Sequence, residues 1–434
     1  MVKFLQIIIT LCCTSFFFFP FYPSVLPLVN TKMIMAACGL ATLCVELSRK
    51  RSGTTDKDFL VLSLLATGVS MASFLSMVIN DTPDNSYLSY LISMWVWIGA
   101  AYFMTRLIKW THNEVSVELV CFYLIAVSTI QCIIAIYADM NAGFKSLLDS
   151  LMVGEGFMGT NESRMYGLGC ALDVAGAKFS AVVVMIGFLL PLIMKRGNNK
   201  VVFGLLMISY FIIAFVGNMI GRTTIVGLVL SILYLVYIST FGKTLQNTLK
   251  REFAIRMCGL IAISLLIGTI LYNTNTQWQK NIDFGFEGPI SLIKTGKWEV
   301  KSNEMLMDGY KWPDNLHTWI IGDGYMDSTK NDPYYVGTNN LYWYAGTDAG
   351  YCRFIFYFGL FGLSLFTLFM FTACCFCRKK FPKYKSLFLI FFVINMIVWL
   401  KVSTDIFLVF APFLCIAASE QEEYEKSVNA IEQT

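Results

Sequence analysis

Long runs of apolar residues, separated by short polar stretches, fill most of this chain. Each run is roughly 17 to 25 residues long, which is enough for an α-helix to cross about 30 Å of hydrocarbon. The pattern predicts an all-α polytopic membrane protein with about twelve transmembrane helices. We place these helices at residues 4–22, 27–47, 58–79, 87–104, 116–137, 176–194, 201–217, 222–240, 256–272, 354–377, 384–400 and 402–418.

Composition supports the same class. The chain has 434 residues, of which 56% are hydrophobic and only 14% are charged, and its mean hydropathy is +0.61. A soluble domain of ordinary composition is far less apolar. The net charge of +4 comes from basic residues scattered through short loops, so it does not indicate a nucleic-acid partner. The first apolar run lacks a small-residue cleavage site, and we interpret it as a retained helix rather than a secretory signal.

Basic residues occur in every even-numbered loop between the predicted helices. The positive-inside rule therefore places the even loops and both termini in the cytoplasm. The odd loops then face outward, including residues 138–175 and a long polar loop at 273–346 between the ninth and tenth helices. The predicted division is helices one to nine at 1–272, the outer loop at 273–346, helices ten to twelve at 347–418, and a solvated acidic tail at 419–434.

Three arginines fall on the predicted outer side. Arg164 lies in the 138–175 segment, Arg222 lies in a tight bend between two apolar runs, and Arg353 lies where the large loop re-enters a helix. Asp173 follows Arg164 at the start of the next helix. Two alternatives to a functional role stay open, because arginine can snorkel to lipid headgroups and the Arg164 segment can be an ordinary outer loop.

The large outer loop is rich in aromatic residues. It holds five of the nine tryptophans, among them Trp319 and Trp343, together with tyrosines such as Tyr342. Aromatic rings flanked by Asp, Asn and Gly suit a sugar-binding surface, since pyranose rings present an apolar C–H face. An interfacial aromatic belt is the competing interpretation. Prolines and glycines argue against long helices here, although a short helix near 289–295 is compatible with them.

Two charged residues, Lys401 and Asp405, stand four positions apart at the outer end of the last helix pair. On one continuous helix they would share a face and could pair. Ionisable residues at membrane depth are functional candidates.

The layout and four short motifs resemble the O-antigen polymerase (Wzy-type) and O-antigen ligase group of bacterial polysaccharide membrane enzymes. The motifs are Gly221-Arg222-Thr223, Ile321-Gly322-Asp323-Gly324, Thr347-Asp348-Ala349-Gly350-Tyr351-Cys352-Arg353 and Phe358-Gly359-Leu360-Phe361-Gly362. The segment from Arg164 to Lys178 and the pair formed by Lys401 and Asp405 are similar to the polymerase branch.

This resemblance implies a GT-C-like inverting glycosyltransferase in the bacterial inner membrane, with its active site facing the periplasm. It would join oligosaccharide repeat units carried on a polyprenyl diphosphate into O-antigen, capsule or exopolysaccharide. The implied partners are lipid-linked glycans and membrane lipids, with a chain-length regulator and a flippase as further candidates.

The residues can be assigned roles within that scheme. The forked guanidinium groups of Arg164, Arg222 and Arg353 suit a diphosphate leaving group. The acceptor hydroxyl needs a base within hydrogen-bond reach, and either Asp348 or His317 could supply it. Asp173, Lys401 and Asp405 would support the site, and Trp319, Tyr342 and Trp343 would contact glycan. No Asp-x-Asp pair occurs in the outer loops, so we expect neither a metal nor another cofactor.

Two alternative functions remain open. A ligase would transfer glycan to lipid A-core, although its pattern has a histidine near the end of the outer loop, where this chain has Asn339-Asn340-Leu341-Tyr342. A lipid-linked oligosaccharide flippase belongs to another class; transporters of that kind usually contain internal repeats and polar residues deep in their helices.

Overall fold

The structure is a computed structural model that describes residues 2–49, 57–153, 164–196, 200–240, 247–327, 329–331, 335 and 343–432. The described part of the chain is helical and contains no β-strand beyond two isolated bridges. Its α-helices are α1 (Val2–Phe18), α2 (Thr31–Arg49), α3 (Lys57–Asn80), α4 (Tyr90–His112), α5 (Val117–Met140), α6 (Ala142–Leu151), α8 (Leu172–Arg196), α9 (Lys200–Ile220), α10 (Thr224–Thr240), α11 (Asn247–Thr274), α12 (Thr276–Gly285), α13 (Glu287–Thr295), α14 (Lys301–Gly309), α15 (Leu316–Ile320), α16 (Gly350–Lys380), α17 (Lys385–Val398), α18 (Phe407–Cys415) and α19 (Ala418–Glu432).

Seven helices in the described residues are long and apolar enough to cross a membrane. They are α2, α3, α4, α5, α8, α9 and α16, and each matches one of the predicted apolar runs. The helices α1, α10, α17 and the apolar end of α11 are shorter, and α18 is shorter still. The predicted all-α membrane class is therefore supported, while the full count of twelve spans stays a prediction.

The chain divides into two compact units that do not follow its order. Unit 1 contains residues 1–35, 100–298 and 415–434, and unit 2 contains residues 36–99 and 299–414. The long polar loop predicted at 273–346 is thus shared between the units, with the change at residue 298.

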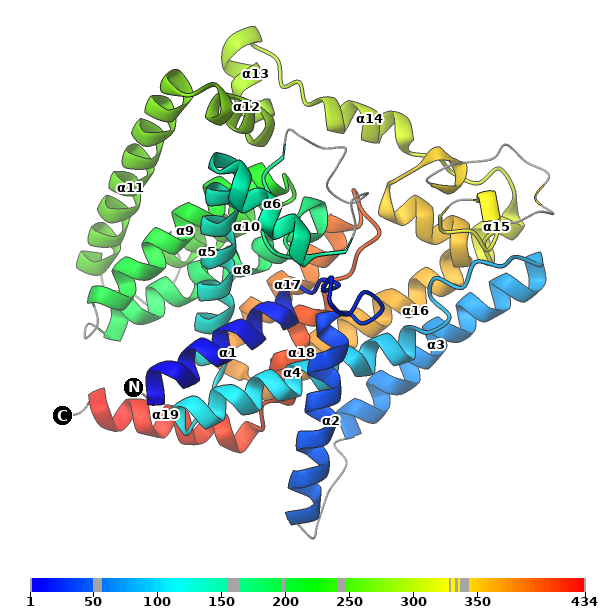
Figure 1. The fold of residues 1–434 in the computed structure, drawn as a ribbon, viewed down its shortest axis with the longest axis horizontal. Helices are drawn as coiled ribbons and strands as arrows, with labels where there is room; N and C mark the ends of the chain where they lie inside the picture. The colour runs from blue at the N-terminus through cyan, green and yellow to red at the C-terminus, as the bar shows by residue number, and fades with distance from the viewer. Residues whose placement is uncertain are drawn as a thin grey trace. The chain divides into compact units, whose positions relative to one another are not determined.

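Helix α8 forms the centre of unit 1. Of its apolar stretch, 94% of the residues are buried, and α5, α9 and α10 pack around it (Figure 1). Glycine permits the close contact with α10, because a Cβ atom at Gly227 would lie 2.2 Å from the carbonyl oxygen of Ser180. Small residues at such crossings let helix backbones approach closely in membrane proteins.

The C-terminal helix α19 also belongs to unit 1 and is docked rather than solvated, unlike the predicted free tail. Buried Glu118, at the start of α5, accepts hydrogen bonds from both Nη atoms of Arg196 at 2.6 and 2.8 Å. Tyr424 of α19 donates its hydroxyl to the same carboxylate at 3.1 Å, and Gln421 accepts the Val117 amide at 2.9 Å. These bonds satisfy the charge of Glu118 where water is excluded.

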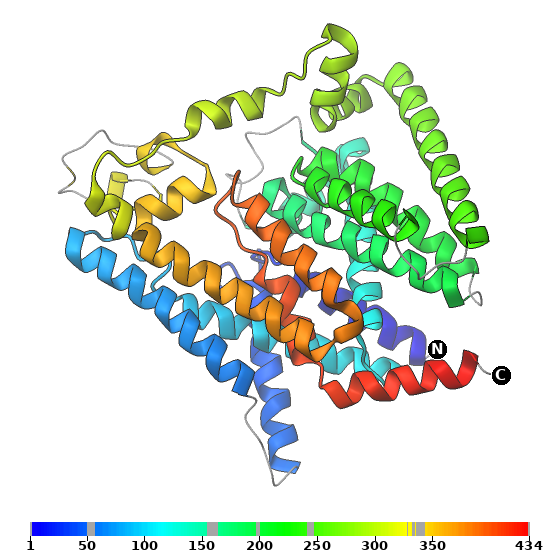
Figure 2. The ribbon, with the colours of Figure 1, turned by 180° about the vertical axis from the view of Figure 1, so that it is seen from behind.

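In unit 2, α3 and α16 lie side by side, and α17 packs against α16 (Figures 1 and 2). Helix α16 is broken at Phe358 and Gly359, where Gly359 takes a φ of 65° and a ψ of −173°. A Cβ atom at Gly359 would lie 2.1 Å from the carbonyl oxygen of Ile320. Both its backbone angles and its neighbour therefore require glycine.

Candidate functional site

The predicted site residues fall into two groups, one in each unit. Arg164, Asp173 and Arg222 belong to unit 1, whereas Arg353, Asp348, His317, Lys401, Asp405, Trp319 and Trp343 belong to unit 2. Tyr342 lies outside the described residues.

In unit 1, the turn between α9 and α10 packs against the start of α8. This contact holds Arg222, which lies in the turn, in place. A Cβ atom at Gly221 would lie 2.3 Å from the carbonyl oxygen of Leu172, so only glycine allows the contact. Thr223 donates its hydroxyl to Asp173 at 2.5 Å. Ser180 donates to the carbonyl of Thr223 at 2.7 Å. Asp173 thus has a clear local role, which is to hold the turn that carries Arg222.

Helix α12 is anchored next to this turn. Asn275 caps its N-terminus by accepting the amides of Gln277 and Trp278, as expected for an Asn in that position. Asp139, at the end of α5, accepts hydrogen bonds from Gln277 at 3.1 Å and from Asn281 at 2.8 Å. The last turn of α12 therefore presents Phe284 at a defined position.

Two of the predicted arginines converge on that ring. The guanidinium carbon of Arg222 lies 4.1 Å from the Phe284 ring centroid, and that of Arg164 lies 4.7 Å from it. Glu287, in the first turn of α13, pairs with Arg222 at 2.6 Å. The carboxylate of Glu287 is also favoured by the positive end of the α13 dipole.

Beside Arg222 lies an open pocket of about 380 Å³, which we call the Arg222 pocket. Its lining residues are Arg222, Asp283, Phe284, Glu287, Ile290, Ser291, Lys294 and Thr295. Burial lowers the pKa of Arg222 and Glu287 raises it, and a guanidinium stays charged in either case. The lining thus combines fixed positive groups, carboxylates, hydroxyls and one aromatic ring.

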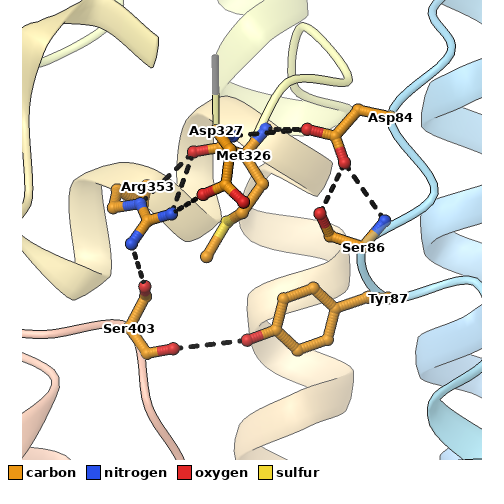
Figure 3. A network of polar contacts seen from close by, with 7 residues as sticks. All are labelled: Asp84, Ser86, Tyr87, Met326, Asp327, Arg353 and Ser403. Atoms are coloured by element: carbon orange, nitrogen blue, oxygen red, sulfur yellow. Dashed lines mark hydrogen bonds and ion pairs between the residues drawn. The ribbon is translucent and has the colours of Figure 1, made fainter. Parts of the chain in front are cut away.

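The cluster around Arg353 in unit 2 has a different character (Figure 3). The Arg353 side chain is 9% exposed. It donates to the carbonyl of Met326 from Nε at 3.3 Å and from Nη2 at 3.1 Å, to Ser403 from Nη1 at 2.6 Å, and to Asp327. Trp343 covers its face, with the guanidinium carbon 4.0 Å from the ring centroid.

The same network continues to the loop between α3 and α4. Asp84 accepts the amide of Met326 at 2.7 Å and the amide of Ser86 at 3.1 Å, and Tyr87 donates to the carbonyl of Ser403 at 3.3 Å (Figure 3). Burial raises the pKa of Asp327 more than the Arg353 guanidinium lowers it. The hydrogen bonds of Arg353 are therefore directed to other residues of the protein. The network that they belong to links three loops of unit 2.

Two of the sequence motifs contact each other at the break in α16. The break frees the carbonyls of Phe356 and Tyr357, which accept the amides of Asp323 at 2.6 Å and Gly324 at 3.2 Å. Gly322 and Gly324 both have positive φ angles, of 87° and 74°. Amides of the motif at 321–324 therefore bind the carbonyls at the end of the first part of α16. Gly359, in the motif at 358–362, leaves room for this contact.

The predicted bases are both exposed. His317 lies on the five-residue helix α15, and Asp348 lies just before the N-terminus of α16.

Trp319, which was predicted to contact glycan, stacks on Trp312 with ring centroids 5.7 Å apart and donates its indole N–H to the carbonyl of Pro313 at 2.9 Å.

The pair formed by Lys401 and Asp405 does not lie on one helix. Helix α17 ends at Val398 and α18 begins at Phe407, so both residues belong to the connection between them. Asp405 accepts the amide of Phe407 at 2.9 Å and thereby caps the start of α18. The helical spacing that suggested the pair does not apply here.

Of the lining residues of the Arg222 pocket, only Arg222 was predicted; the charged residues Asp283, Glu287 and Lys294 and the aromatic Phe284 were among those missed. Such residues are ordinary in a polar loop, and no motif marks them. The i, i+4 spacing of Asp283 and Glu287 is a weak signal, because the glycine at 285 and the proline at 289 conceal a helical period. The short helix expected near 289–295 is confirmed by α13.

Comparison with known proteins identifies no relative, since no family model, curated protein or solved structure matches this chain. Within the described residues, no group of His, Cys, Asp or Glu side chains is arranged to hold a metal ion.

Proposed function

We propose that this chain is an inverting membrane glycosyltransferase that joins oligosaccharide repeat units carried on a polyprenyl diphosphate. One observation carries the proposal: Arg164 and Arg222 meet on the Phe284 ring beside an open pocket. Two guanidinium groups on one ring repel each other. An anion in the pocket would offset that repulsion, and Glu287 does so in its absence.

A diphosphate is the anion that this arrangement suits best. Guanidinium groups bind phosphate oxygens through paired hydrogen bonds and keep their charge at all physiological pH values. When the bond from the sugar to the diphosphate breaks, negative charge concentrates on the leaving oxygen. Fixed cations there stabilise the transition state more than the ground state.

The location of the pocket is consistent with a lipid-linked substrate. Arg222 lies at the end of α9, a helix long and apolar enough to cross a membrane, and the positive-inside pattern predicts that this end faces outward. A polyprenyl chain in the outer leaflet would bring its diphosphate to the same level. We propose the bacterial inner membrane as the location, with the periplasm on the side of the pocket.

The experiment is the surface glycan ladder of a strain that lacks this chain, complemented with wild type, Arg222→Gln or Lys297→Gln. Lys297 is an exposed basic residue that follows the lining residues Lys294 and Thr295 in the sequence. Its substitution by Gln removes the same charge as Arg222→Gln and therefore controls for that change. We expect wild type and Lys297→Gln to restore long glycans. Arg222→Gln should leave single repeats at normal protein level, because removal of one transition-state donor typically costs about 10²–10³-fold in rate.

Other outcomes of that experiment would assign other functions. Lipid-linked polymer that accumulates without attachment would indicate a ligase. Single repeats that accumulate on the cytoplasmic face would indicate a flippase. A normal ladder with Arg222→Gln would contradict the role of the Arg222 pocket.

A further inference from the structure

Two lining residues of the Arg222 pocket, Asp283 and Lys294, form a set of polar contacts with Tyr272, which lies outside the lining. Tyr272, in the last turns of α11, donates its hydroxyl to Asp283 Oδ1 at 3.1 Å. Lys294 of α13 donates to the Tyr272 oxygen at 3.0 Å and lies 3.8 Å from Asp283 Oδ1. Tyr272 on α11 and Lys294 on α13 therefore both lie close to the carboxylate of Asp283 on α12.

We propose that Asp283 is the base that takes the proton of the attacking acceptor hydroxyl, and that Tyr272 and Lys294 position it. This inference rests on the proposed function. In the step, the acceptor oxygen forms a bond to the anomeric carbon, and the bond from that carbon to the diphosphate oxygen breaks. The electron pair goes to the diphosphate beside Arg222, and the acceptor proton goes to Asp283.

The other carboxylates near the pocket suit this role less well. Glu287 pairs with Arg222 at 2.6 Å, which places it on the side of the pocket assigned to the leaving diphosphate, whereas the base must contact the acceptor. Asp173 accepts the hydroxyl of Thr223 and is not a lining residue of the pocket. Asp348 and His317, the bases predicted from the sequence, are not lining residues of the pocket.

Tyr272 and Lys294 orient the carboxylate of Asp283 but leave part of it exposed to water. Its side chain is 43% exposed, so a proton taken from the acceptor can pass to water. The hydrogen bond to Tyr272 raises the pKa of Lys294, and Asp283 raises it further, so Lys294 stays charged. Arg222, Glu287 and Lys294 line the pocket together with Asp283, and Tyr272 contacts its carboxylate.

The test uses purified full-length protein in liposomes with a lipid-linked repeat unit, comparing wild type, Asp283→Asn, Tyr272→Phe and Asp308→Asn. Asp308 is an exposed aspartate on α14 and serves as the matched control. Asp283→Asn should lower the rate of chain extension at least about 100-fold, as expected for loss of a general base. Binding of polyprenyl diphosphate alone should stay within about twofold of wild type.

Tyr272→Phe keeps the carboxylate and supplies an independent measurement. Loss of the donated hydrogen bond removes one of the groups that orient the Asp283 carboxylate, so kcat per folded molecule should fall while KM for the lipid-linked repeat unit stays unchanged. A loss of activity that only follows the amount of folded protein, with kcat per folded molecule unchanged, would overturn the positioning role of Tyr272.

The outcomes separate the two proposals. If wild type extends chains and Asp283→Asn does so at the same rate, Asp283 is not the base, while the proposed function stands. If wild type forms no glycosidic bond in this assay, the proposed function is overturned, and the role of Asp283 with it.

Discussion

Arg222 and Arg353 occupy similar places in the sequence and very different places in the structure. Each stands where an apolar helix meets a predicted outer loop. The side chain of Arg353 is enclosed by Met326, Ser403, Asp327 and Trp343. Arg222 instead pairs with a carboxylate at the edge of an open pocket and shares the Phe284 ring with a second arginine.

The difference teaches how to separate an arginine that maintains a fold from one that can bind a ligand. A guanidinium has five N–H donors in a fixed fork, and the direction of those donors decides its role. In unit 2 the donors are directed to loop carbonyls and side chains. In unit 1 the charge of Arg222 is offset by Glu287, a group that a stronger anion could replace.

The largest expected effect is on the stability of unit 2. Arg353→Ala would leave the carbonyl of Met326 and the hydroxyl of Ser403 without their donor. The carbonyl of Met326 is buried and Ser403 is half-buried. The free energy of unfolding should therefore fall by about 2–4 kcal/mol, because a buried polar group left unpaired costs about 1–3 kcal/mol and a half-buried one costs less. Thermal unfolding in detergent would measure it, with exposed Lys311→Ala as the control.

Arg222→Ala should change that unfolding temperature far less, since partly exposed ion pairs contribute about 1 kcal/mol or less. If Arg222→Ala lowered the unfolding temperature more than Arg353→Ala did, the comparison between the two arginines would be reversed.

Lysine substitutions sharpen the contrast in activity. Arg222→Lys keeps the charge but loses the planar fork, so chain extension should fall about tenfold, which corresponds to about 1.4 kcal/mol of transition-state binding. Arg353→Lys should change chain extension per folded molecule by less than about twofold. Rates normalised to the amount of folded protein would test both, and equal losses would argue against separate roles.

A smaller effect is expected at Glu287. Glu287→Gln removes the carboxylate that competes with an incoming anion for Arg222. Binding of polyprenyl diphosphate should tighten about 3–10-fold, which matches the loss of a competing ion pair worth about 1 kcal/mol. Equilibrium binding to liposomes that contain the lipid would measure this. Weaker binding by Glu287→Gln would mean that Glu287 contacts the ligand itself.

The smallest expected effect concerns pH and Asp327. Because burial raises the pKa of Asp327, the folded protein holds the carboxyl proton of Asp327 more tightly than the unfolded chain does. The associated stability is fully present below the ordinary carboxyl pKa of about 4 and is lost as pH rises through the raised value. Asp327→Asn should remove that slope from the unfolding temperature measured between about pH 4 and 7. An unchanged slope would assign it to another group.

The sequence predicted much of the transmembrane framework because apolar length is a local property. The run at 58–79 corresponds to α3, and the run at 201–217 corresponds to α9. The break at Gly359 could not be predicted, because it depends on the approach of residues 320–324 from a distant part of the chain.

The candidate site was predicted only in part for the same reason. Arg164 and Arg222 were predicted to carry outward charges, but nothing local indicated that both would contact Phe284. Docking of the C-terminal helix was missed, although Glu118 inside a predicted span was a usable signal. An ionisable residue in an apolar run needs a partner, and Arg196 and Tyr424 supply it.

The docked helix α19 has a consequence for biosynthesis. Glu118 and Tyr424 are 306 residues apart, so the ribosome must make most of the chain between the two partners. At about 5–20 residues per second, this interval lasts roughly 15–60 s. During that time the start of α5 lacks its final cover, and truncation before Gln421 would make the gap permanent. Helix α19 thus completes a contact whose other half, at the start of α5, is synthesised much earlier.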